Sequence, residues 1–299
     1  MKTLTIFTPA YNRAHTLVRT YQSLCQQTCK DFEWLIIDDG STDNTTHIVE
    51  KWINEADFTI RYIYQENQGM HGAHNTAYKN ITTELNTCID SDDYMPTDAV
   101  ESIVTFWQKN RDNNYSGFIG LDQREDGSII GTKFPLWMKE TTLQDFYAKG
   151  GKGDKKLVYR TEIITQYPEY PLFEGERYVG LAYKYMLIDQ DYKMLTLNKP
   201  LVTVEYQADG SSNMMWKQYW NNPRGFAFFR KTEMVVASTL KRKFISCVHY
   251  ISSCIISKNK RFLNESPQKT LTLLAIIPGV ILYNIIKHKV KQNKSLLVK

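Results

Sequence analysis

The sequence predicts an α/β fold, a doubly wound and mainly parallel sheet with helices on both faces, followed by a C-terminal helical region. Strand-like and helix-like segments alternate four times within about the first 110 residues, which is the order that builds a parallel sheet. Polar residues follow three of the predicted strands, where ligands of such sheets bind. After about residue 227 the composition changes and becomes both basic and apolar.

The predicted strands are short apolar runs. In chain order they are Leu4–Phe7, Trp34–Ile37, Ile60–Tyr64, Leu85–Ile89, Gly117–Leu121 and Pro200–Tyr206, the last followed by a turn at Asp209–Ser211. The expected helices are Leu17–Cys25, Ile48–Trp52, Ala73–Tyr78 and Asp98–Lys109. Thr42 or Asp43 is placed to cap the second helix. The Gly/Lys-rich segment Lys149–Lys156 is expected to be a loop, because it lacks the framing and closing residues of a P-loop.

Charge divides the chain into an acidic body and a basic tail. The net charge is +5, but residues 230–299 hold 14 Lys or Arg against two Glu, a net of +12 that leaves −7 on the rest. We therefore predict one domain over residues 1–226 and a basic helical region over residues 227–299. In that region Leu271–Ile286 is an apolar run of 16 residues, broken by Pro278-Gly279 and followed by four Lys.

This apolar run is shorter than the about 20 residues that span a bilayer. An apolar stretch beside clustered Lys is typical of an interfacial helix or re-entrant hairpin on an anionic leaflet. The alternative is a pair of helices packed on the body. Nucleic acid is not an expected partner, since a nucleic-acid arm would not need the apolar residues. No signal-peptide pattern opens the sequence and the five Cys form no zinc set, so we expect a cytoplasmic protein, peripheral on the inner face of the cell membrane.

Two acidic clusters carry the strongest chemical signal. Asp90, Asp92 and Asp93 follow a predicted strand, and carboxylates this close repel one another unless a cation binds. Mn²⁺ or Mg²⁺ is commonly held by one or two carboxylates together with substrate phosphates, so the cluster suits a metal–diphosphate. A solvated acidic turn is the alternative. Asp39 and Gly40 follow an earlier strand on the same predicted edge, where Asp39 can accept hydrogen bonds from a base or ribose.

These residues belong to three ordered motifs, Thr8–Arg13, Ile37–Thr45 and Ile89–Asp93. Together the motifs resemble the signature of family 2 glycosyltransferases with the GT-A fold, and the resemblance covers roughly residues 1–215. It implies an inverting transfer of a sugar from a nucleoside-diphosphate donor, of UDP or dTDP type, onto a hydroxyl.

The same resemblance implies residue roles on the donor side. The nucleotide would lie against Ala10, Tyr11, Arg13, Asp39 and Asp90, with Asp39 on the base ring. Asp92, helped by Asp90 or Asp93, would hold Mn²⁺ or Mg²⁺ on the diphosphate. His71 or His74 could approach the donor; the alternative is that these His are structural.

An inverting transfer also needs a base for the acceptor hydroxyl. Glu174–Gly180 resembles the family's segment before that base, but Leu181 stands where a carboxylate is expected. Glu176 is the first nominee and Glu174 the second, followed by Asp189 and Asp191. The alternative is that all four are surface carboxylates.

The sequence therefore predicts a metal-dependent glycosyltransferase that adds a single sugar. The Gln-x-x-Arg-Trp motif of processive polysaccharide synthases is absent. The expected acceptor is a lipid-linked saccharide in the biosynthesis of a capsule, an exopolysaccharide or another surface polysaccharide. The alternative is a membrane-docked scaffold on a catalytically decayed glycosyltransferase fold.

Overall fold

The computed structural model describes residues 2–205 and 214–296. It contains two compact units, of which the first comprises Met1–Glu169 and Ile188–Gln207 and the second Tyr170–Leu187 and Ala208–Lys299. The domain boundary between residues 226 and 227 remains a prediction. The predicted turn at Asp209–Ser211 lies outside the described residues.

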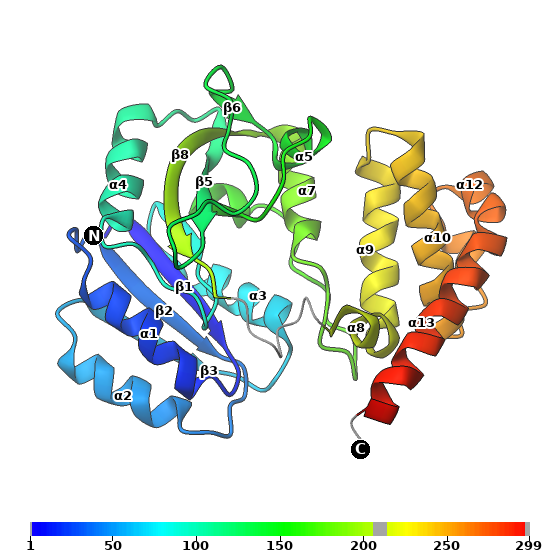
Figure 1. The fold of residues 1–299 in the computed structure, drawn as a ribbon, viewed down its shortest axis with the longest axis horizontal. Helices are drawn as coiled ribbons and strands as arrows, with labels where there is room; N and C mark the ends of the chain where they lie inside the picture. The colour runs from blue at the N-terminus through cyan, green and yellow to red at the C-terminus, as the bar shows by residue number, and fades with distance from the viewer. Residues whose placement is uncertain (1, 206–213, 297–299) are drawn as a thin grey trace. The chain divides into compact units, whose positions relative to one another are not determined.

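The first unit is built on a sheet with the strand order β3-β2-β1-β4-β7-β5-β8-β6 (Figure 1). Its strands are β1 (Leu4–Ala10), β2 (Phe32–Asp38), β3 (Thr59–Tyr64), β4 (Leu85–Cys88), β5 (Tyr115–Gln123), β6 (Glu140–Thr141), β7 (Lys155–Arg160) and β8 (Lys193–Thr203). Strands β1 to β4 pair in parallel, as do β5 and β8, whereas β7 and β6 pair antiparallel with their neighbours. The predicted α/β class with a mainly parallel sheet is confirmed.

Helices pack on both faces of this sheet. The helices of the first unit are α1 (Ala14–Cys25), α2 (Thr45–Glu55), α3 (Met70–Asn80), α4 (Ala99–Asn110), α5 (Leu143–Ala148) and α6 (Thr161–Ile164). On one face Leu4 and Ile6 of β1 join a core cluster with side chains of α1, α2 and α4. On the other face the ring of Phe7 meets α3 edge-on, with centroids 5.0 Å from His74 and 5.4 Å from Tyr78. Strand alternation thus buries β1 on both sides, as a central parallel strand requires.

Two predictions about the later strands were wrong in their bounds. Lys155 and Lys156 belong to β7 and not to a loop, because Leu157–Tyr159 continues them as an apolar run that pairs with β5. The last strand is β8, which begins seven residues before Pro200 and ends at Thr203. Its pairing partners β5 and β6 come from distant parts of the chain, so the local pattern does not mark its beginning.

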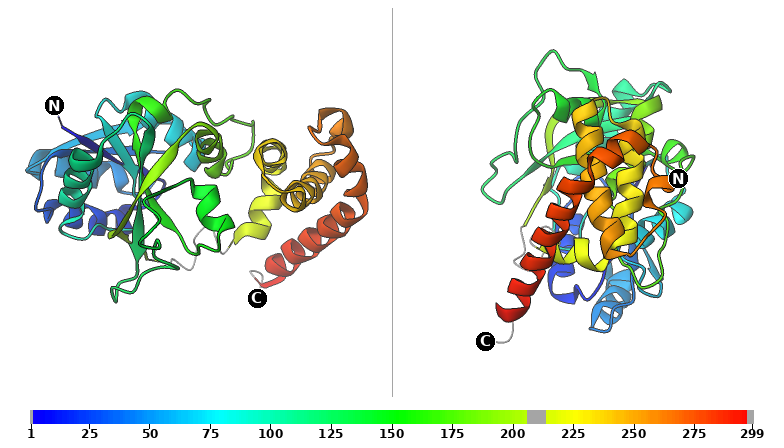
Figure 2. Two further views of the ribbon diagram at one scale, coloured as in Figure 1. Left: turned by 90° about the horizontal axis from the view of Figure 1, so that it is seen from above. Right: turned by 90° about the vertical axis from the view of Figure 1, so that its right-hand side faces the viewer.

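The second unit is helical. It contains α8 (Met215–Asn221), α9 (Pro223–Val236), α10 (Leu240–Ile256), α11 (Phe262–Glu265), α12 (Lys269–Leu274), α13 (Ile276–Leu296) and most of α7 (Ala182–Asp191). Helix α10 packs against both α9 and α13, which Figure 2 shows in yellow, orange and red. Cys247, Tyr250 and Ile251 of α10 are buried at the centre of this packing.

The predicted break at Pro278-Gly279 does not interrupt α13. Pro278 is the third residue of the helix, where a backbone N–H has no partner within the helix, so proline is tolerated. A Cβ on Gly279 would lie 2.5 Å from the side chain of Ile251, so glycine allows α13 to approach α10 closely. Within residues 2–205 and 214–296, no helix is long and apolar enough to cross a membrane.

We predict that Phe7→Ala lowers the free energy of unfolding of the first unit by about 3–5 kcal/mol, because it leaves a cavity between β1 and α3. Chemical denaturation followed by circular dichroism measures this loss. The control is Tyr64→Ala at an exposed position of β3, which should change the stability by about 0.5 kcal/mol or less. Equal effects of the two variants would contradict this account of the core.

Candidate active site

The three sequence motifs meet where β1, β2 and β4 end. Ala10 is in register with Asp38, and the N–H of Asp39 donates to the carbonyl of Ala10 at 2.8 Å. On the other side of β1, Phe7 is in register with Cys88 and accepts from the N–H of Ile89 at 2.9 Å. The loops after β2 and β4 therefore leave the sheet on either side of the loop after β1.

Asn12 ties the first of these loops to the second. Its Oδ1 accepts from the backbone N–H groups of Thr42 at 2.8 Å and Asp43 at 3.3 Å, and its own N–H donates to Oγ of Ser41 at 2.8 Å. Asn12 has a positive φ of 54°, a conformation that Asn adopts more readily than most residues. The sequence predicted a nucleotide contact for its neighbours Ala10, Tyr11 and Arg13, but it did not predict that Asn12 joins the two loops. An Asn within a strand-end motif was the available signal.

Asp39 is buried and holds the loop between β3 and α3. Its carboxylate accepts from Nε2 of Gln65 at 2.7 Å and from the backbone N–H groups of Gln68 at 2.8 Å and Gly69 at 2.7 Å. Gly40 beside it has φ of +87°, and a Cβ there would lie 2.9 Å from the backbone nitrogen of Asn67. The observed role of Asp39 is thus to fix the loop, and its contact with a base stays a prediction.

The acidic loop after β4 contains one buried carboxylate and two that are partly exposed. Asp93 is buried and accepts from the N–H of Glu205 at 3.1 Å, whereas Asp90 and Asp92 are half-buried. Burial, and then the negative charge of Asp90, raises the pKa of Asp93 to about 8. The surroundings of Asp93 therefore disfavour the charged form of this carboxylate.

Lys156 and Asp122 belong to this cluster, and the sequence analysis missed both. Nζ of Lys156 donates to the carbonyl of Cys88 at 3.0 Å. Burial disfavours its ammonium, but the carboxylates of Asp122, Asp90 and Asp93 outweigh burial and raise the pKa of Lys156. Burial raises the pKa of Asp122 to about 6, against the opposing charge of Lys156. The apolar run after Lys156 was the signal that could have placed it in a strand.

The residues present fit a divalent cation that arrives with a diphosphate. No group of three His, Cys, Asp or Glu in the described part of the chain could hold a metal by itself. Mg²⁺ and similar ions need only one or two carboxylates when phosphates complete the shell. The raised pKa of Asp93 marks a place where a cation would relieve repulsion, and Oδ1 of Asp122 is buried without a hydrogen-bond partner among the described residues.

Glu176, the first nominee for the base, caps helix α9. One carboxylate oxygen accepts from the backbone N–H of Arg224 at 3.0 Å and from its Nε at 2.9 Å, and the other accepts from the N–H of Gly225 at 2.8 Å. Glu176 is buried in this arrangement. The carboxylate thereby satisfies two backbone N–H groups in the first turn of α9, a structural role of Glu176 that the sequence did not predict.

The other nominees also have structural surroundings. The side chain of Glu174 is exposed. Asp189 accepts from the N–H of Gln144 at 2.9 Å at the start of α5, and burial raises its pKa to about 6. Asp191 accepts from the hydroxyl of Tyr167 at 2.8 Å. The identity of the base therefore stays a prediction.

The two His of α3 are buried. Nδ1 of His74 lies 2.9 Å from the carbonyl of Met70, and its ring packs on Phe7 under β1. His71 is buried on the same helix. The surroundings of His74 match the structural alternative.

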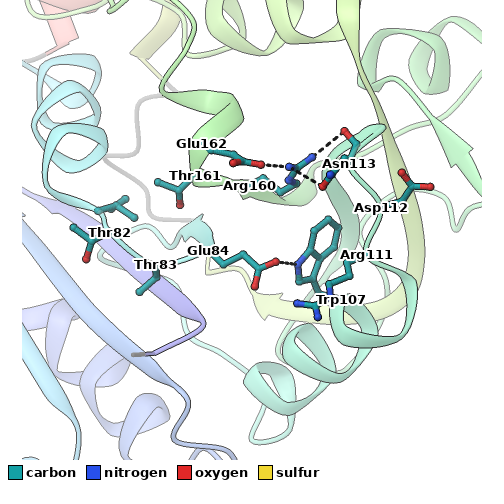
Figure 3. Close-up of a pocket in the computed structure, with 11 residues that line it drawn as sticks. Thr82, Thr83, Glu84, Trp107, Arg111, Asp112, Asn113, Arg160, Thr161 and Glu162 are labelled. Atoms are coloured by element: carbon teal, nitrogen blue, oxygen red, sulfur yellow. Dashed lines mark hydrogen bonds and ion pairs between the residues drawn. The ribbon is translucent and has the colours of Figure 1, made fainter.

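A separate pocket of about 700 Å³ lies at the other end of β4, where Leu85 begins the strand in register with Arg160 (Figure 3). Glu84 accepts from Nε1 of Trp107 at 2.7 Å, and the Arg160 guanidinium contacts Glu162 and donates to the carbonyl of Asn113 at 3.0 Å. Arg160 thus forms an ion pair with Glu162, and Glu84 is held by the indole of Trp107. This pocket is therefore distinct from the acidic cluster, which follows the last residue of β4.

Comparisons with known proteins agree with this geometry. The family model described as Glycosyl transferase family 2 matches residues 5–167. Glycosyltransferase GlyA of Streptococcus pneumoniae is 37% identical over 100 residues, which are 33% of this chain and 14% of that protein. Chondroitin synthase of Escherichia coli is 33% identical over 140 residues, 46% of this chain and 20% of that protein. The chain thus spans a fifth or less of the length of these relatives.

One relative matches over most of its length. It is the Escherichia coli enzyme named UDP-Glc:alpha-D-GlcNAc-diphosphoundecaprenol beta-1,3-glucosyltransferase WfgD, 28% identical over 70% of this chain and 78% of its own. Among solved structures, S. aureus TarS 1-349 in complex with UDP-GlcNAc has a TM-score of 0.57 at 17% identity, covering 98% of this chain and 92% of that chain. The mannosyltransferase PcManGT from Pyrobaculum calidifontis, in complex with GDP-Man and Mn²⁺, has a TM-score of 0.54 at 16% identity. The match covers 94% of this chain and 86% of that chain. These structural likenesses establish the fold.

We predict that Asp93→Asn stabilises the metal-free protein increasingly as pH rises. Asn keeps the acceptor for the N–H of Glu205 but cannot ionise. Because the pKa of Asp93 is raised to about 8 on folding, the wild type loses stability as pH rises from about 4, its unfolded value, through about 8. Asp93→Asn does not lose stability in this way, because Asn has no proton to release in this pH range.

Melting temperatures in EDTA should therefore differ more at pH 8 than at pH 5, with no further increase above about pH 8. The control is Asp126→Asn on an exposed turn, where the difference should stay flat across this range. A flat difference for Asp93→Asn as well would contradict the raised pKa.

We predict that Glu176→Ala lowers the free energy of unfolding by about 1–3 kcal/mol, because it leaves N–H groups of α9 without their acceptor. The matched control is Glu174→Ala, where the exposed side chain should contribute about 0.5 kcal/mol or less. Thermal denaturation measures both. Unchanged stability in Glu176→Gln together with lost sugar transfer would show instead that Glu176 is the base.

Proposed function

The chain belongs to glycosyl transferase family 2, and we propose that it is an inverting, metal-dependent enzyme that transfers a single sugar from a UDP- or dTDP-linked donor. The acceptor is a hydroxyl of a lipid-linked saccharide in surface polysaccharide biosynthesis. The observation that carries the proposal is the meeting of the loops after β1, β2 and β4 at one sheet edge, with the acidic cluster in the third loop. The match to WfgD, an enzyme whose name specifies a diphosphoundecaprenol-linked acceptor, supports the acceptor class.

On the donor side the nucleotide lies against Ala10, Tyr11 and Arg13. The loop that Asp39 fixes through Gln68 and Gly69 forms the neighbouring wall. Exposed Tyr11 offers a ring face to the base, and half-buried Arg13 offers a guanidinium to phosphate. The hydrogen bonds of Asn12 keep this wall rigid before the donor arrives, which lowers the entropic cost of binding.

The diphosphate is bound at the acidic cluster. Asp92, with Asp90 or Asp93, holds Mn²⁺ or Mg²⁺, which when bound acts as a Lewis acid for the departing diphosphate. The structures of PcManGT and of GalNAc-T7 with Mn²⁺ support a divalent ion in this fold. Lys156 balances part of the carboxylate charge, so the cluster does not depend on the metal alone for its stability.

The acceptor hydroxyl must lose a proton as the sugar is transferred. Glu176 and Glu174 are the proposed bases, on the resemblance of their segment to the family's. The three N–H donors on Glu176 compete with a hydroxyl proton for its oxygens. This competition makes Glu174, whose side chain is exposed, the candidate of equal standing.

The surface of α13 supports a membrane partner at the cytosolic face. Ile277, Ile281 and Ile285 recur every four residues with exposed fractions of 74%, 55% and 44%, so they line one face of the helix. Ile286 and Val290 are buried on the opposite face. Exposed Lys287, Lys289 and Lys291 follow in the next turns of α13 and flank this face, and an interfacial helix binds an anionic leaflet by such an arrangement.

A membrane-docked scaffold on a decayed fold is the second candidate function. The observation in its favour is the structural engagement of Glu176, which leaves the position of the base unassigned. The two candidates differ in the acidic cluster, since a decayed site would have no need to keep Asp93, a buried carboxylate whose pKa is raised by burial and by the charge of Asp90. Hydrolysis of nucleotide sugars, screened with membrane lipid extract as acceptor, distinguishes them.

We predict that the purified protein binds UDP or dTDP in the presence of Mn²⁺, and that Asp92→Ala weakens this binding about 10- to 100-fold. That range corresponds to the loss of one contact with a charged group. The matched control is Asp126→Ala, which removes a carboxylate from an exposed turn and should leave binding unchanged. Titration calorimetry with and without Mn²⁺ measures both.

Absence of Mn²⁺-dependent binding to any nucleoside diphosphate, with no effect of Asp92→Ala, would refute the proposed enzyme. Binding without turnover of any nucleotide sugar would favour the scaffold.

A further inference from the structure

An apolar groove lies beside the C-terminal end of α10, between α10 and α13. It has a volume of about 340 Å³, within the about 300–1,000 Å³ of ligand pockets. We call it the α10–α13 groove, and its apolar lining consists of Ile251, Cys254, Ile255, Phe262, Ile276 and Val280. The remaining lining residues are Lys258, Asn259 and Lys260, which follow α10. The groove therefore combines a hydrocarbon lining with two cationic side chains.

Lys258 occupies the left-handed backbone position at the C-terminal end of α10. The N–H of Asn259 donates to the carbonyl of Cys254 at 2.9 Å and that of Lys258 to Ile255 at 3.2 Å, the hydrogen bonds of a Schellman cap. The left-handed position of such a cap is usually glycine, yet Lys258 occupies it with φ of 56°. Lys258 is thus a non-glycine residue at a strained backbone position beside the groove.

The positive charge beside the groove is not neutralised within the described residues. The side chains of Lys258 and Lys260 are exposed and make no ion pair there. Glu265, the nearby carboxylate, pairs with Lys231 at 3.7 Å and accepts from Nδ2 of Asn259 at 3.1 Å. Lys258 and Lys260 are thus available to an anionic ligand.

The groove is continuous with the exposed apolar face of α13. Val280 lines the groove and is 41% exposed, and Ile277 and Ile281 beside it belong to the face that the proposed membrane contact covers. Gly279 lies against Ile251 at the lining of the groove, which brings the two helices close together there. The apolar lining of the groove and the exposed apolar face of α13 therefore adjoin each other at Val280.

We propose that the α10–α13 groove binds one acyl chain of an anionic membrane phospholipid, with the lipid phosphate at Lys258 and Lys260. This inference rests on the proposed membrane partner. It adds a defined binding site for a single lipid to the proposed contact between α13 and the membrane surface. A second copy docked through the same face is disfavoured as occupant, because its own Lys258 and Lys260 would face those of the first copy. An anionic lipid matches both the apolar lining and the charge.

The test uses the full chain and dioctanoyl phosphatidylglycerol below its micelle concentration, so that no bilayer surface is present. Titration calorimetry should detect saturable binding, with weaker binding of dioctanoyl phosphatidylcholine. Val280→Trp fills the groove and should weaken binding about tenfold or more. Val235→Trp, at an exposed position on α9, is the matched control and should bind as the wild type does.

Lys258→Gly separates the lipid contact from folding. Glycine suits the left-handed position, so the melting temperature should stay equal or rise, while lipid binding weakens about fivefold for one lost cation. Lys241→Gln, at an exposed site at the start of α10, should leave binding unchanged. Wild-type affinity in both Val280→Trp and Lys258→Gly would overturn the proposal.

Two further measurements identify which proposal fails. The first is the affinity of the protein for farnesyl phosphate. If farnesyl phosphate binds more than about tenfold tighter than the phospholipid, the groove would be assigned to a polyprenyl acceptor and the phospholipid assignment would be overturned. Mn²⁺-dependent UDP binding is measured on the same preparations. Lipid binding without UDP binding would leave the groove supported and refute the donor site, and UDP binding without lipid binding would refute the groove alone.

Discussion

The parallel register of β1 between β2 and β4 is the constraint on which the donor side depends. Three strands that run the same way end at the same edge, so the residues that follow them must gather there. The hydrogen bond from Asp39 to Ala10 and those of Asn12 then join the first two loops into one wall. A shift of β1 by one residue would change its register with β2 and β4, and these contacts could not form. The same shift would turn Phe7 away from α3.

Charge balance is the second constraint, and it acts across the sheet. Asp93 lies in the loop after β4 and Asp122 in β5, and burial together with the charge of Asp90 raises the pKa of each. Lys156 of β7 supplies a compensating cation from a strand that runs antiparallel to β4. The cluster is thus partly neutralised by the protein and remains able to accept a divalent ion with a diphosphate. A fully neutralised cluster would bind the ion weakly, and an uncompensated one would destabilise the fold.

The second unit has a different physical organisation. Helix α13 buries Ile286 and Val290 and exposes Ile277 and Ile281, so one face is covered within the unit and the other is exposed. The α10–α13 groove lies where the exposed face meets the cap of α10. A family 2 sequence and a basic helical region therefore coexist in one chain, and our proposal of a lipid-linked acceptor at an anionic membrane rests on this combination.

Sequence periodicity by itself determined the four βα repeats of the first 110 residues and the strand-end positions of Asp39 and Asp92, since strand alternation and helix amphipathicity are local properties. The ordered motifs identified the family. Only the tertiary structure decided that Lys156 lies in a strand against the acidic cluster, because its pairing partner β5 is distant in the sequence. Likewise, the donors that occupy Glu176 come from Arg224 and Gly225, 48 and 49 residues further along. Charge compensation and helix capping depend on which distant residues the fold brings together, and no local pattern contains that information.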